Sequence, residues 1–207
     1  MKKALITSVI LFISFTGFSQ HLSVNVFGGY TFRDKLDLYQ TYAYINGGGM
    51  FGASIEGINA QGSGLELLYQ YQSTAIPVYN YQNNQQVAAN SSSVVSYLLL
   101  NFEQYYMNNP KIQPYGGIGF GAAFYKGNSP NTSSDAQFAW DLKGGVKIMA
   151  SSNFGIKIGA QLLGSAKATG TSFYVPYPGY VYPYTTYTTI LQFGLTGGLV
   201  FDFGGGH

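Results

Sequence analysis

The fold is decided by an alternating stretch near the end of the chain, LQFGLTGGLVFDF at residues 191–203. Nearly every second residue is apolar, which is the period of a β-strand with one apolar face. The apolar face carries Leu191, Phe193, Leu195, Leu199, Phe201 and Phe203. Because Gln192, Thr196 and Asp202 alternate with them, the stretch predicts a strand whose two faces differ in polarity.

The same alternation recurs seven more times along the chain, so we expect eight strands. The expected strands are residues 21–33, 48–58, 64–73, 93–106, 112–125, 136–149, 153–164 and 187–203. The connections alternate between short turns and long loops, the long ones being 34–47, 74–92, 126–135 and 165–186. This arrangement predicts an all-β fold, an eight-stranded antiparallel up-and-down transmembrane β-barrel with short turns and both termini at one rim.

The strand expected at 93–106 is apolar on both faces, so its register is ambiguous. We expect Leu98, Leu100 and Phe102 to point outward, because the other register would place Glu103 on the outer face.

Composition favours lipid as the solvent of the apolar face. Only 9% of the residues are charged, against about 25% in ordinary soluble proteins. Aromatic residues gather at both ends of the apolar face, as in the two girdles of membrane barrels. The net charge of +2 provides no basic surface for nucleic acid, and the absence of Cys excludes disulfides and thiolate metal sites.

The opposite face carries eight charges that we expect to pair across the barrel lumen. They are Glu56, Glu66, Glu103, Asp141, Lys143, Lys147, Lys157 and Asp202. The same face has many glycines, which either leave room in a narrow lumen or mark bends in its wall. Both explanations are compatible with a barrel.

The first nineteen residues are expected to be a signal peptide. Lys2 and Lys3 precede an apolar run at 4–18, and Gly17 and Ser19 supply the small residues of a cleavage site. The run is shorter than the ~20 residues of a spanning helix, which disfavours the alternative of a membrane anchor. We therefore expect a signal peptide at 1–19, a barrel at 20–203 and a short periplasmic tail at 204–207.

The chain offers little catalytic chemistry. The glycine run at 116–121 lacks the spacing of a dinucleotide loop, and His21 and His207 lie at the ends of the barrel segment and of the chain. Glu56 and Glu66 flank a short turn and could act as an acid–base pair, although lumen ion pairing is the favoured alternative. We expect no catalytic site, no cofactor and no metal site.

The last long loop is rich in tyrosine and proline. Its candidates for contact with a surface protein or glycan are Tyr174, Tyr177, Tyr180, Tyr182 and Tyr184. Alternatively, this loop folds over the barrel mouth or extends the upper aromatic girdle.

Two stretches resemble known outer-membrane proteins. Thr196, Gly198, Phe201 and Phe203 match the C-terminal signal that the barrel-assembly machinery recognises, although the tail at 204–207 departs from it. Residues 96–124 resemble the small outer-membrane β-barrel domain families, akin to the OmpA and OmpX barrels. The resemblance implies a barrel in the outer membrane of a Gram-negative bacterium, in contact with its lipid and with the assembly machinery during biogenesis.

Together these features predict a non-enzymatic outer-membrane barrel with a structural or adhesin-like role carried by its long loops. Two alternatives stay open: a narrow pore for ions or small solutes, and a secreted soluble barrel that binds an apolar ligand.

Overall fold

The computed structural model describes residues 21–37, 41–75, 77–80, 85–88, 92–127, 135–166 and 189–203. The expected signal peptide at 1–19, the tail at 204–207 and the five tyrosine contact candidates at 174–184 lie outside these residues. In the described part of the chain, no helix is long and apolar enough to cross a bilayer.

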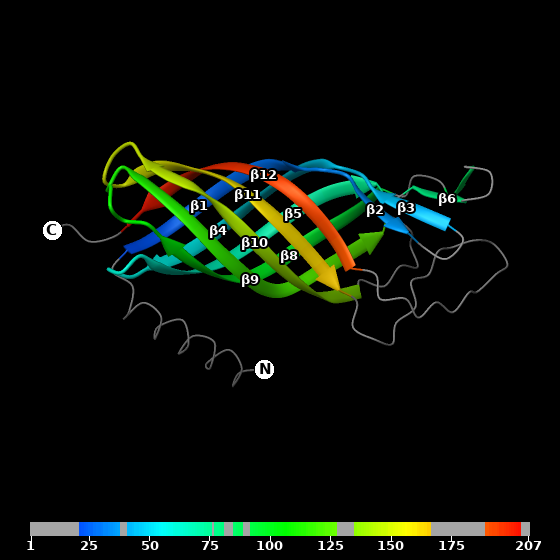
Figure 1. Ribbon diagram of the computed structural model, residues 1–207, viewed down its shortest axis with the longest axis horizontal. Coiled ribbons are helices and arrows are strands. Elements are labelled where there is room, and N and C mark those ends of the chain that lie inside the picture. The colour runs from blue at the N-terminus through cyan, green and yellow to red at the C-terminus, as the bar shows by residue number, and fades with distance from the viewer. Residues whose placement is uncertain are drawn as a thin grey trace, which may run out of the picture.

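Eight long strands close into an antiparallel barrel in the order β1-β12-β11-β10-β9-β8-β5-β4, as Figure 1 shows. They are β1 His21–Thr31, β4 Gly48–Ile58, β5 Ser63–Ala75, β8 Ser92–Tyr105, β9 Ile112–Gly127, β10 Asp135–Met149, β11 Phe154–Ala166 and β12 Thr189–Asp202. Each strand pairs with its neighbours along the chain, and β1 closes the barrel against β12. The predicted fold class is therefore confirmed, with every strand end within two residues of its predicted position.

The stagger of the strands fixes the width of the barrel. Following the paired residues once around the wall from His21 leads to Thr31, ten residues further along β1. The path runs through His21, Ile58, Gly64, Glu103, Gly117, Lys143, Gln161, Gly194 and Thr31. A closed barrel with such a stagger has strands tilted by roughly 35–45° and an interior that side chains fill.

The two faces of the wall have the predicted polarity. In the ambiguous strand β8, Leu100 is 40% exposed on the outer face whereas Leu99 is 0% exposed in the lumen. The outward placement of Leu98, Leu100 and Phe102 is confirmed, because all three are exposed while Glu103 is buried. An apolar outer face and a polar lumen do not support the alternative of a soluble barrel around an apolar ligand.

The first short turn shows how the sequence ends one strand and starts the next. Asn59 Oδ1 accepts hydrogen bonds from the backbone N–H groups of Gln61 and Ser63. Gly62 takes a φ of +83°, a left-handed conformation that glycine adopts without a steric penalty. The turn therefore places Glu56 and Glu66 opposite each other on β4 and β5.

Two of the predicted long loops contain a second sheet, which sequence analysis did not foresee. Its strands are β2 Asp34–Asp37, β3 Thr41–Ile45, β6 Val78–Asn80 and β7 Gln86–Ala88, in the order β2-β3-β6-β7. In Figure 1 its labelled strands lie beyond the end of the barrel opposite to the one where β1 begins and β12 ends. The sheet continues the β1–β4 and β5–β8 hairpins past the rim.

The first strand ends at Thr31, two residues before its expected end at residue 33. The exposed Arg33 lies beyond β1 and stacks its guanidinium 3.3 Å from the centre of the Tyr44 ring. Tyr42 and Tyr79 stack beside it with their ring centres 5.3 Å apart. These ring contacts hold the small sheet together, since its strands have only three to five residues each.

The lumen glycines make room for other side chains. A Cβ on Gly159 would lie 2.5 Å from the Tyr115 hydroxyl, and one on Gly119 would overlap the side-chain oxygens of Asn101 and Asp141. Such approaches are shorter than real Cβ contacts. These glycines therefore support the explanation that a narrow lumen needs space at these positions.

Gly117→Ala is expected to destabilise the barrel, whereas Gly116→Ala is not. A Cβ at Gly117 would lie 2.7 Å from the Phe102 carbonyl oxygen, but one at Gly116 would meet no atom closer than 4.0 Å. Overpacking of this kind costs about 1–3 kcal/mol. Urea unfolding of the two variants in detergent, followed by the gel mobility of the folded band, measures the difference. Equal stability of the variants would contradict the close packing of the lumen.

Candidate functional site

The candidate site is the charged lumen in the half of the barrel nearer the short turns. Glu56, Glu66 and Glu103 come from the adjacent strands β4, β5 and β8, and Lys143 and Lys157 come from β10 and β11 across the lumen. Alternation along each strand turns all five side chains inward. Acids thus line one wall and lysines the other.

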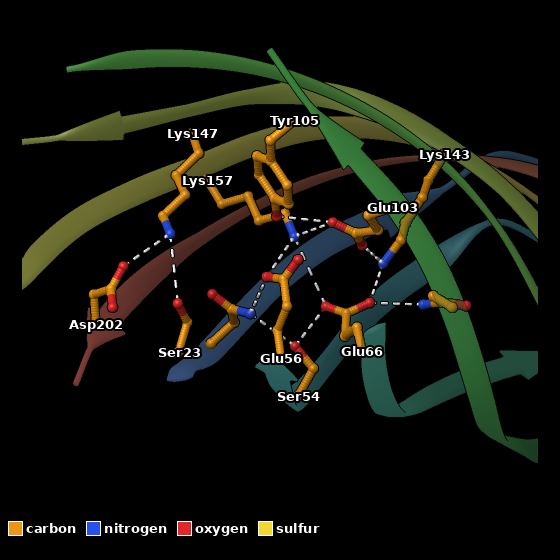
Figure 2. Close-up of polar contacts among 12 residues, drawn as sticks. Ser23, Ser54, Glu56, Glu66, Glu103, Tyr105, Lys143, Lys147, Lys157 and Asp202 are labelled. Carbon is orange, nitrogen blue, oxygen red and sulfur yellow. Dashed lines mark hydrogen bonds and ion pairs between the residues drawn. The ribbon is translucent and has the colours of Figure 1, made fainter. Parts of the chain in front are cut away.

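Lys143 and Lys157 each bind several carboxylates at once, as Figure 2 shows. Lys157 Nζ lies 2.8 Å from Glu103 Oε2, 3.4 Å from Glu56 Oε2 and 3.8 Å from Glu66 Oε1. Lys143 Nζ forms ion pairs with Glu66 and Glu103. Both lysine side chains are at most 10% exposed, so these ion pairs are weakly screened by solvent.

Neutral side chains donate further hydrogen bonds to the same carboxylates. Ser54 Oγ donates to Glu66 Oε1 at 2.6 Å, and Asn101 Nδ2 donates to Glu66 Oε2 at 2.7 Å. Tyr105 Oη donates to Glu103 Oε2 at 2.8 Å. Additional donors of this kind lower the cost of burying an ion pair, and they do so here for Glu66 and Glu103.

Aromatic rings complete the packing around Lys157. Its Nζ lies 4.4 Å from the centre of the Tyr115 ring and 5.3 Å from that of Tyr105. The two rings stack with their centres 5.4 Å apart. Cation–π contacts of this length add to the ion pairs and hold the ammonium group in place.

A smaller ion pair lies closer to the short-turn rim. Lys147 Nζ is 3.3 Å from Asp202 Oδ2 and 3.4 Å from Ser23 Oγ. His21 Nδ1 lies 3.7 Å from the other oxygen of Asp202. This pair joins β10 to β12 and β1 near the point where the two ends of the barrel sheet meet.

The lumen toward the long loops is filled by uncharged residues. Leu68, Val95, Tyr97, Leu99, Ala123, Ala139 and Leu163 form a buried apolar cluster. Two amide pairs span this half, Gln161 to Gln70 at 3.0 Å and Gln72 to Gln192 at 3.1 Å. A cavity of about 30 Å³ lies between the two halves, beside Glu66, Lys143 and Lys157. It has room for one or two water molecules but not for a solute.

Seven of the eight predicted lumen charges form ion pairs in the described part of the chain, and Asp141 is the exception. Asp141 is buried on the lumen face, yet no ion pair of Asp141 occurs among the described residues, because both central lysines are held by the three glutamates. Sequence analysis also missed the polar partners Asn25, Ser54, Asn101, Tyr105 and Tyr115. The alternation predicts that these side chains point inward, but a neutral residue gives no sign in the sequence that it binds a charged one.

Glu56 and Glu66 lie directly opposite each other on β4 and β5. Both are buried and held by Lys157, and Lys143 binds Glu66 as well. The geometry therefore supports the ion-pairing alternative for these two residues. No group of three or more potential metal-ligating residues occurs in the described part of the chain.

The four residues that match the C-terminal assembly signal divide between the two faces of β12. Thr196 Oγ1 donates to the Gly159 carbonyl at 3.2 Å, and Gly198 packs closely against Phe27. Phe201 and Phe203 are exposed on the outer face. The recognition of these residues by assembly machinery stays a prediction.

Comparison with solved structures identifies the architecture. Neisserial surface protein A has 13% sequence identity and a TM-score of 0.59, over 89% of this chain and 98% of that chain. The fold is that of small outer-membrane barrels. OprG from Pseudomonas aeruginosa also matches, with 14% sequence identity and a TM-score of 0.58 over 89% of this chain and 96% of that chain. The N-terminal barrel domain of OprF from the same organism matches with 15% identity and a TM-score of 0.51, over 89% of this chain and 98% of that chain. No family model and no curated protein matches the sequence.

Lys157→Met is expected to destabilise the folded barrel by about 3–5 kcal/mol, because it leaves three buried carboxylates short of one cation. Lys111→Met, in an exposed short turn, is the matched control and should leave stability unchanged. The temperature at which the folded gel band is lost measures both effects. Unaltered stability of the Lys157 variant would show that the ion pairs do not stabilise the barrel.

Proposed function

We propose that this protein is an integral barrel of a Gram-negative outer membrane, with a closed lumen and a surface-contact role at its long-loop end. The observation that carries the proposal is the apolar outer face of the closed barrel, on which no described side chain is charged. Exposed apolar residues occur on all eight strands, including Val26, Ile55, Leu67, Leu100, Ile118, Leu142, Ile158 and Leu195. A soluble monomer rarely exposes an apolar patch larger than a few hundred Å².

The height of the apolar band fits a bilayer. Phe193 packs against Phe32 near the long-loop rim, with ring centres 5.6 Å apart, and Phe203 follows the other end of β12. Ten residues at the rise of a tilted strand span about 25 Å along the barrel axis. Outer-membrane barrels have an apolar band of ≈ 25 Å between two aromatic girdles.

We assign contact with other molecules to the long-loop end of the barrel, because the connections between strands are much longer there than at the short-turn end. The second sheet extends beyond the rim, and the exposed cations Arg33, just before β2, and Lys35 lie over its Tyr44 and Tyr42 rings. The tyrosine-rich segment at 167–188 stands in the sequence between the end of β11 and the start of β12, and these two strand ends pair at the same rim. Tyrosine surfaces suit protein or glycan partners, because the side chain offers a large contact area with little entropy to lose.

A pore receives no support from the lumen. Ion pairs, tyrosines and the apolar cluster fill it across the described residues, and the cavity of about 30 Å³ holds only water. We therefore propose no second function.

Ile118→Arg is expected to block insertion, whereas Ile112→Arg is tolerated. Both residues point outward from β9, Ile118 near the middle of the band and Ile112 at its short-turn edge. Arg at the bilayer midplane costs about 2–4 kcal/mol, falling to about 0–1 near the interface. Folding yields into lipid vesicles measure the difference, and equal yields would contradict a bilayer around the outer face.

An epitope inserted within residues 167–188 is expected to be labelled by antibody on intact cells. The same epitope in the short turn at 107–111 should be labelled only after the outer membrane is permeabilised, because short turns face the periplasm. Labelling of the short-turn epitope on intact cells would reverse the proposed orientation.

A further inference from the structure

Among the lumen acids that the structure describes, only Asp141 forms no ion pair with a lysine. Its side chain is 0% exposed on the inner face of β10. Within the described part of the chain, neither of its carboxylate oxygens has a hydrogen-bond donor. An ionised carboxylate in this state is far more costly than one that is paired and hydrogen-bonded.

The residues of the wall beside Asp141 come from the three strands β8, β9 and β11. Gly119 on β9 and Leu163 on β11 are its register partners, and Asn101 on β8 lies beyond Gly119. A Cβ built on Gly119 would overlap both Asn101 Oδ1 and Asp141 Oδ1, so both oxygens approach the same point above the glycine. The charged groups that act on Asp141 are Lys143, Glu66, Glu103 and Lys157.

Two hydrogen-bond acceptors thus approach each other without a donor. The amide of Asn101 is held in its orientation because Nδ2 donates to Glu66 Oε2 at 2.7 Å. Asn101 Oδ1 is buried and, like the Asp141 oxygens, has no donor among the described residues. Turning the amide over would satisfy Asp141 but would place the carbonyl oxygen against the Glu66 carboxylate.

The lysines of the lumen do not supply the missing charge. Lys143 is bound by Glu66 and Glu103, and Lys157 by all three glutamates. The central cluster therefore contains four carboxylates, including Asp141, and two ammonium groups. An added positive charge beside Asp141 would lower the cost of this imbalance.

We propose that the lumen holds one exchangeable monovalent cation, a proton or a sodium ion, between the Asp141 carboxylate and Asn101 Oδ1. A proton on Asp141 would turn the carboxylate into a donor to Asn101 Oδ1. A sodium ion would take oxygen ligands from both side chains. Either cation satisfies the two facing acceptors and reduces the negative charge of the central cluster.

Asp141→Asn tests the site, because an amide supplies the missing donor with no negative charge. The matched control is Glu103→Gln, which removes one negative charge from an acid that the lysines already bind. The loss of the folded gel band is measured in detergent over a pH series, and at constant ionic strength in sodium chloride or choline chloride. We expect Asp141→Asn to be at least as stable as the unmodified protein and to lose its cation dependence, whereas Glu103→Gln is less stable and keeps it.

Two measurements distinguish a bound proton from a bound sodium ion. If the cation is a proton, raising the pH lowers the melting point of the unmodified protein but not of Asp141→Asn, because the folded state binds a proton that the unfolded chain releases. Infrared spectra then show the carbonyl band of a protonated carboxylic acid that Asp141→Asn lacks. If the cation is sodium, choline replacement lowers the melting point without that band. The proposal is overturned if the band is absent and both proteins respond identically to pH and to sodium.

Discussion

Closure of the sheet is the constraint on which the rest of the structure depends. A wall of eight strands with a ten-residue stagger leaves no unpaired edge within the barrel. It satisfies the backbone hydrogen bonds in the only way that strands can do so in lipid. In a closed barrel, every strand has one face that points outward and one face that points into the lumen. Because the described side chains of the outer face are uncharged, the charges described on the barrel strands are accommodated inside.

The narrow interior decides how those charges are arranged. Long lysine side chains from β10 and β11 cross the lumen to glutamates on β4, β5 and β8, and small residues such as Gly117 and Gly159 leave the space. The ion pairs join strands far apart around the wall, so they add contacts that neighbouring strands cannot make. The same narrowness isolates Asp141, because both central lysines are already held by glutamates.

The alternation of residues was enough to predict the strands, their inner and outer faces and the closed barrel, because period two is a local property. Partners across the lumen could not be predicted, since the pairing of Lys157 with Glu103 depends on the stagger summed around the barrel. Asp141 carries the same local pattern as its paired neighbours, and only the structure distinguishes it. The second sheet was missed because strands such as Val78–Asn80 are too short to show a period.

Trp140 offers the most direct test of the claim that the apolar face meets lipid. It is the single tryptophan of the chain, and its ring packs over Gly164 on the outer face of β11. In vesicles of lipids brominated near the headgroup end of the acyl chain, the bromine should strongly quench the fluorescence of Trp140. Iodide in the aqueous phase should quench it only weakly. Quenching by iodide without any effect of the brominated lipid would contradict the account.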